Sequence, residues 1–167
     1  MSAEKPVLVG IDGSCDGLIA LNWAASYATL RHAPLHAVYV LDDQRQPRVS
    51  TPPTGPDDVL AEAFQELGLI GFTGASLEVR HGHPAKVLHE LSERAQVLVV
   101  GRRGVGGFAE LLLGSGPQLC TALSTDVPLV VGPDTWDPAA PLRGRIVVGI
   151  DGSPESQDAV RFAFEQA

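Results

Sequence analysis

Apolar runs alternate with segments of helical spacing along the first 131 residues of the chain. Unbroken apolar runs, such as Val-Leu-Val-Val at residues 97–100, predict strands that are buried on both faces. Apolar side chains at helical spacing, such as Leu18, Leu21 and Ala25, predict helices. We expect strands over residues 6–11, 35–41, 75–80, 97–100 and 128–131, and helices over residues 16–31, 57–67, 84–95 and 115–123.

This alternation of strands and helices predicts the fold class. Such a chain forms right-handed crossovers, which produce a parallel sheet with helices on both faces. We expect an α/β fold with an open five-stranded parallel sheet in the strand order 3-2-1-4-5. A sheet of this kind binds ligands at the carboxyl ends of its strands, where the strand order reverses. That point lies between the first and fourth strands, which end at Asp12 and Gly101.

The composition narrows the classes of function. The chain has 167 residues, of which 44% are hydrophobic and 19% charged, and its formal net charge is −8. A diffuse acidic balance argues against nucleic-acid binding, which needs clustered Lys and Arg. Cys15 and Cys120 have no metal-ligand spacing and do not form a disulfide framework. The sequence shows neither a signal-peptide pattern nor an apolar run of transmembrane length, so we expect a cytoplasmic protein without a membrane partner.

The beginning of the chain is repeated near its end. Residues 9–14 (Val-Gly-Ile-Asp-Gly-Ser) recur as residues 148–153, at an offset of 139 residues, and the alanines that follow recur in the same register. The proline-rich residues between the two copies are typical of a linker. We expect one domain at 1–132, a linker at 133–144, and the first strand and helix of a truncated second domain at 145–167.

The repeated strand, residues 146–150, would be exposed without the rest of its domain. An exposed apolar strand is an aggregation-prone edge. We therefore expect this strand to dock against the first domain or to exchange with a second chain.

A glycine-rich loop follows the fourth expected strand. Two residues separate Gly101 from Gly104, nine separate Gly104 from Gly114, and Ser115 follows at once. Glycines let backbone N–H groups approach an anion, and a helix that starts at Ser115 favours negative charge there. The loop is not a Walker A motif, because the chain has no Gly-Lys-Ser/Thr triplet, and Ala109 replaces the third glycine of a Rossmann fingerprint. The pattern predicts a phosphate-binding loop.

This spacing resembles the G-x2-G-x9-G-(S/T) signature of the ATP-binding universal stress proteins. The segments 9–14, 82–85 and 128–131 also resemble that family's first strand, the turn before its third helix and its last strand. The resemblance implies a Rossmann-like fold, a cytoplasmic location, a homodimer or tandem duplication, and ATP as the ligand, with Mg²⁺ as a possible companion.

The resemblance also implies roles for individual residues. Asp12 and the backbone of Ile11 would lie beside the ribose and adenine of the nucleotide. Val40 would offer backbone hydrogen bonds and an apolar contact to the adenine. The phosphates would be bound by the loop residues Gly101, Gly104, Gly114 and Ser115.

The sequence departs from the family pattern directly after Ser115. Members commonly have a small apolar residue and then a second hydroxyl, whereas this chain has Gly116 and Pro117. Pro117 has neither a side-chain hydroxyl nor a backbone N–H, so one or two phosphate donors are missing. Arg102 or Arg103 could compensate by pairing with phosphate; the alternative is that both arginines only form a solvated surface.

Structural roles without a ligand remain open for the same residues. Asp12 could cap the first helix or satisfy a turn, Ser115 could be an N-cap, and the glycines could belong to a flexible loop. His81 and His83 form a His-x-His pair, but no carboxylate or cysteine is near them in the sequence, so we expect no metal site.

Three functions remain. The first is an ATP-binding regulatory module that responds to nucleotide occupancy without rapid turnover. The second is a slow nucleotide hydrolase or nucleotidyl transferase on the same fold. It is disfavoured because the loop shows no obvious Lys, His or paired carboxylates. The third is a nucleotide-free dimerisation module, which the Gly116-Pro117 departure favours.

Overall fold

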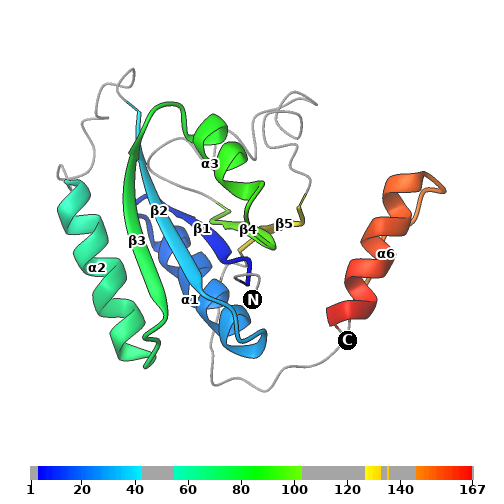
Figure 1. Ribbon diagram of the computed structural model, residues 1–167, viewed down its shortest axis with the longest axis horizontal. Helices are drawn as coiled ribbons and strands as arrows, with labels where there is room; N and C mark the ends of the chain where they lie inside the picture. Colours follow the sequence, from blue (N-terminus) through cyan, green and yellow to red (C-terminus); the bar gives the residue numbers. More distant parts are fainter. Residues whose placement is uncertain (1–3, 43–54, 103–126, 133–134, 136–145, 167) are drawn as a thin grey trace.

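The computed structural model describes residues 4–42, 55–102, 127–132, 135 and 146–166. Its strands form one parallel sheet in the order β3-β2-β1-β4-β5, which confirms the predicted fold (Figure 1). The strands are β1 (Val7–Ile11), β2 (Leu35–Leu41), β3 (Ala75–His81), β4 (Val97–Val100) and β5 (Leu129–Val131). The helices are α1 (Cys15–Leu30), α2 (Pro56–Leu69), α3 (Pro84–Ser92) and α6 (Pro154–Gln166).

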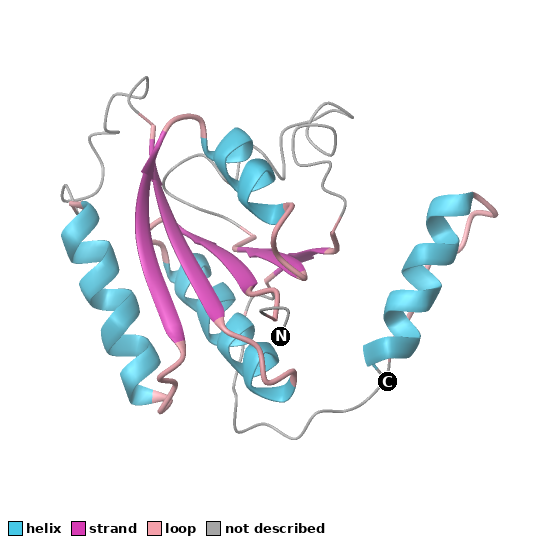
Figure 2. Ribbon diagram, viewed as in Figure 1, coloured by secondary structure: helices cyan, strands magenta, loops and turns pink. Residues whose placement is uncertain are grey.

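Helices cover both faces of the sheet (Figure 2). On one face, Val9 of β1 belongs to a core with Ala24 of α1 and Leu67 of α2. On the other face, Leu8 of β1 belongs to a core with Leu88 of α3. The side chains of β1 and β4 are therefore buried along the whole length of both strands, as their unbroken apolar sequences predict.

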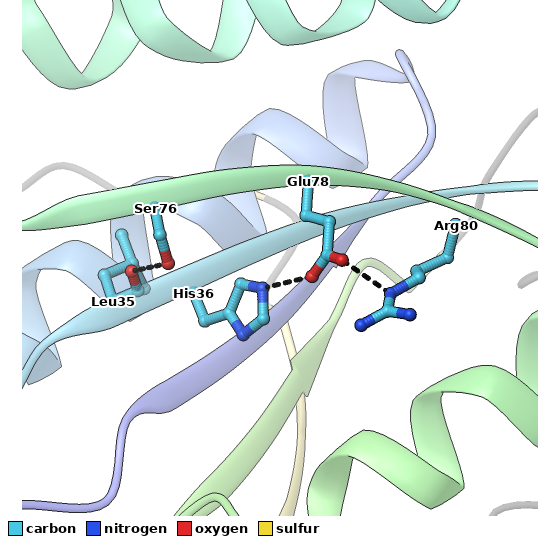
Figure 3. A network of polar contacts seen from close by, with 5 residues as sticks. All are labelled: Leu35, His36, Ser76, Glu78 and Arg80. Carbon is cyan, nitrogen blue, oxygen red and sulfur yellow. Dashed lines mark hydrogen bonds and ion pairs between the residues drawn. The ribbon is translucent and has the colours of Figure 1, made fainter.

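The edge strand β3 carries polar side chains on the α3 side of the sheet, because α3 packs mainly against β1, β2 and β4 (Figure 3). Glu78 of β3 accepts from Arg80 Nε at 2.7 Å and lies 3.0 Å from His36 Nε2 of β2. These side chains are partly exposed, so the Arg80–Glu78 ion pair contributes at most about 1 kcal/mol. Charged groups on an edge strand also discourage pairing with another sheet.

Most element boundaries fall within one or two residues of the predicted ones, and the exceptions have local causes. α1 begins at Cys15 because Ser14 caps it: Ser14 Oγ accepts from Gly17 N at 3.0 Å. α3 ends at Ser92 instead of residue 95, since its last turn tightens and Ala95 N donates to Ser92 O. The helix predicted at 115–123 lies outside the described residues.

Residues 146–150 do not form the strand that their sequence predicts. Ile146 is 48% exposed and Val147 is 93% exposed, whereas their counterparts Val7 and Leu8 are at most 1% exposed. A strand needs a partner for its backbone groups, and here the segment is not paired with the sheet. In the single chain this segment is therefore not a strand of the described sheet. Docking against the first domain or exchange with a second chain stays a prediction.

Hydrogen–deuterium exchange can compare the two copies within one molecule. We expect the amides of residues 146–150 to exchange at least about a hundredfold faster than those of β1, because the sheet protects only β1. Equal protection that is lost on dilution would instead show that residues 146–150 pair with a second chain.

Candidate functional site

The predicted nucleoside contacts lie together at the carboxyl edge of the sheet. The β1–β2 register ends at the pair Ile11–Tyr39, so Asp12 and Val40 are the next residues of the two strands. The β1–β4 register ends at Gly10–Val100, which places Gly101 beside the end of β1. The strand order reverses between β1 and β4 (Figure 1), so Asp12 and Gly101 lie at the switch point where open α/β sheets bind ligands, and Val40 lies on the other side of β1.

Asp12 is buried and organises the turn between β1 and α1. Its Oδ1 accepts from Ser14 N at 3.1 Å and from Ser14 Oγ at 2.5 Å. Gly13 has φ 75°, a value that glycine adopts without a steric penalty. The structure thus gives Asp12 the turn role that the sequence left open. A carboxylate fixed in this way is also a preorganised acceptor at the edge of the sheet.

The second copy of this turn shows that the sequence encodes its geometry locally. Ser153 N donates to Asp151 Oδ1 at 2.9 Å, Gly152 has φ 87°, and Ser156 N donates to Ser153 Oγ at 3.2 Å. Hydrogen bonds from Ser153 lower the pKa of the Asp151 carboxyl. The same turn and cap form here although the residues before the turn are not part of the described sheet. Asp-Gly-Ser followed by a helix therefore needs no surrounding domain.

Gly17 and Gly101 lie where other atoms come too close to leave room for a Cβ, at the first turn of α1. A Cβ on Gly101 would lie 2.8 Å from the carbonyl carbon and oxygen of Asp16. A Cβ on Gly17 would lie 2.8 Å from Asp12 Oδ1. Both distances are shorter than an ordinary Cβ contact. At Gly101 the obstructing atoms are backbone, so glycine is required for packing there, whereas at Gly17 a Cβ would displace the Asp12 carboxylate. Gly101, the first glycine of the loop signature, thus has a structural reason that is independent of any ligand.

The side chains of Ile11 and Val40 are buried in the two hydrophobic cores, one on each face of the sheet. Ile11 belongs to the cluster under α1 and α2, and Val40 to the cluster under α3. Each can therefore contribute mainly its backbone at the carboxyl edge. Arg102 follows Gly101 and is half-buried at the end of β4. The remaining predicted phosphate ligands, Gly104, Gly114 and Ser115, lie outside the described residues, as does the Gly116-Pro117 departure.

Tyr39 was not among the predicted site residues. Its side chain is half-buried on the α1 and α2 face of the sheet. Burial and, secondly, the negative charge of Asp12 raise the pKa of the Tyr39 phenol. The strand pairing could have identified it, because the residue of β2 opposite Ile11 must adjoin the end of β1.

Two further findings concern metals and membranes. Within the described ranges, no three His, Cys, Asp or Glu side chains gather so that they could hold a metal ion. His81 ends β3 and His83 is the N-cap of α3. None of the helices in the part of the chain that the structure describes is long and apolar enough to cross a membrane.

Comparison with known proteins gives consistent matches. The model of the universal stress protein family matches residues 4–125. A universal stress protein of Mycolicibacterium smegmatis is 33% identical to this chain over an alignment of 184 positions. The alignment covers 99% of this chain and 60% of the relative. The chain thus spans less than two thirds of that relative's length.

Solved structures share the fold. A universal stress protein in complex with cAMP has a TM-score of 0.59 and 24% identity over 80% of this chain and all of its own. A universal stress protein from Archaeoglobus fulgidus in complex with dAMP has a TM-score of 0.53 and 17% identity over 78% of this chain and 99% of its own.

The packing role of Gly101 can be tested by Gly101→Ala. We expect this variant to lose about 1–3 kcal/mol of unfolding free energy in urea, because its Cβ would overlap the backbone of α1. The matched control is Gly68→Ala in α2, where a Cβ meets nothing within 4 Å. The control should gain up to about 1 kcal/mol. A Gly101→Ala variant as stable as the wild type would contradict this account of the loop signature.

Proposed function

Since the chain belongs to the universal stress protein family, we propose that it binds an adenine nucleotide at the carboxyl edge of β1, β2 and β4. The observation that carries this proposal is the convergence of Asp12, the backbone of Val40, and Gly101 with Arg102 at the carboxyl edge around the switch point of the sheet. A buried carboxylate accepts hydroxyl hydrogens, backbone groups recognise a base edge, and a glycine with a cation suits a phosphate.

Two proteins of the same fold support adenine as the base. One universal stress protein is solved with cAMP and another with dAMP. Both ligands carry adenine on a sugar with a single phosphate. A triphosphate is thus not needed for a complex in those two proteins.

We propose ATP as the nucleotide, with Mg²⁺ as an optional companion, because of the glycine spacing in residues 101–115. Pro117 removes phosphate donors, and each hydrogen bond to a charged group contributes about 1.5–3 kcal/mol. Arg102 lies next to Gly101 and offers a cation that would offset part of this loss. The Gly116-Pro117 departure also favours a second candidate, a nucleotide-free dimerisation module of the same fold.

In this proposal the protein acts as a nucleotide-responsive regulatory module of the stress response, as a cytoplasmic homodimer. Occupancy of the site, rather than rapid turnover, would change its conformation or assembly. We further propose that residues 145–167 begin a second unit of the same fold. The support is the identical sequence at 148–153 and the repeated turn and helix cap.

Nucleotide content tests the proposal directly. We expect freshly purified protein to release ATP on denaturation, and stripped protein to bind Mg²⁺-ATP saturably in calorimetry. Asp12→Asn should weaken ATP binding by roughly 10- to 100-fold, because the turn survives with an amide oxygen as acceptor but the charge is lost. Gly68→Ala is the matched control and should bind as the wild type does.

The other outcomes separate the alternatives. Release of mostly ADP, together with measurable phosphate production, would favour the slow hydrolase. No release, and no binding of ATP, AMP or cAMP at millimolar concentration, would overturn nucleotide binding and leave the dimerisation module.

A further inference from the structure

We propose that Tyr39 is a ligand-binding residue that selects for a sugar hydroxyl: its phenolic O–H and the Asp12 carboxylate flank one hydroxyl of the nucleotide's ribose. This inference rests on the proposed adenine-nucleotide site and adds a second side chain to it. The ligand hydroxyl would donate to Asp12 and accept from Tyr39.

The strand register brings Tyr39 to this position. Tyr39 pairs with Ile11, and the chain continues from Ile11 directly into Asp12. The last three residues of β2 are Tyr39, Val40 and Leu41, so Tyr39 carries the polar side chain at this end of the strand. It is half-buried, whereas the Val40 side chain is buried on the opposite face. Tyr39 is therefore the side chain of β2 that is best placed to act beside Asp12.

The chemistry of the pair matches a hydroxyl group. Burial and the charge of Asp12 raise the pKa of the Tyr39 phenol, so at neutral pH the phenol is protonated and can donate. Asp12 in its ionised form only accepts, and its Oδ1 is already fixed by Ser14. A donor and an acceptor that both reach one ligand hydroxyl would satisfy it, because a hydroxyl both donates and accepts. They suit a phosphate less well, because the carboxylate would repel it.

Apolar and titratable side chains from α2 and β3 lie around the pair. A Cβ on Gly13 would lie 2.9 Å from Val59 Cγ2, so the first part of α2 closes over the turn with an apolar side chain. On β3, Val79 pairs with Tyr39, and His81 follows two residues later on the same face. In the first turn of α2, Asp58 accepts from Gly55 N at 3.1 Å within the helix cap. Among these groups, Asp12 is the charge that acts on the phenol.

Tyr39→Phe tests the inference when it is combined with nucleotide analogues. We expect this variant to bind ATP roughly three- to tenfold more weakly than the wild type, the value of one neutral hydrogen bond. Against either 2′-deoxy-ATP or 3′-deoxy-ATP, whichever lacks the flanked hydroxyl, the variant should bind as the wild type does. The matched control is Tyr27→Phe, which removes the other tyrosine hydroxyl of the chain but keeps its stacking on Trp23, and should leave all affinities unchanged.

A second measurement tests the pair without any nucleotide. In the Tyr27→Phe background, Tyr39 is the single tyrosine, and its ionisation can be followed by ultraviolet absorbance. Asp12→Asn should lower the pKa of Tyr39, because the negative charge that disfavours the phenolate is gone. An unchanged pKa would show that the two groups are not neighbours and would overturn the inference.

The outcomes distinguish the two proposals. If the wild type binds no nucleotide, the proposed function fails and this inference fails with it. If the wild type binds ATP but Tyr39→Phe weakens ATP and both deoxy analogues equally, or weakens none of them, the proposed function stands. The selective role of Tyr39 is then wrong.

Discussion

The close approach between the first turn of α1 and the ends of β1 and β4 is the constraint on which the candidate site depends. Gly101 has no room for a Cβ beside the Asp16 backbone, and Gly17 has none beside the Asp12 carboxylate. Packing at this distance fixes the direction in which the chain leaves β4. It thereby brings the start of the glycine-rich loop next to the Asp12 turn, at the point where the strand order reverses.

The internal repeat separates local from tertiary causes. The Asp-Gly-Ser turn and its helix cap form in both copies, because their hydrogen bonds join residues two or three positions apart. The strand before the turn forms only in the first copy, where β2 and β4 supply its partners. Identical residues therefore give a buried core strand in one place and an exposed segment in the other.

In the proposed site, the negative Asp12 lies at the end of β1 and the positive Arg102 follows β4, so the two parts of the site suit different parts of a nucleotide. Asp12 is an acceptor that suits hydroxyl groups, and in a chain of net charge −8 it does not attract phosphates. A sugar and base would therefore bind at the ends of β1 and β2, where side chains and strand backbone meet. The phosphates would need the backbone groups after β4 and the cation of Arg102.

The sequence by itself determined the alternation of strands and helices, the strand order and the family, since these follow from apolar periodicity and a spaced glycine motif. It also located Asp12 and Gly101 at one edge, because the carboxyl ends of parallel strands coincide. Only the tertiary structure decided that Gly101 serves packing against α1, that the Ile11 and Val40 side chains are buried in the two cores, that Tyr39 lies opposite Ile11 at the end of β1, and that residues 146–150 are not paired with the described sheet. Each of these depends on neighbours distant in the chain, whose spacing no local pattern contains.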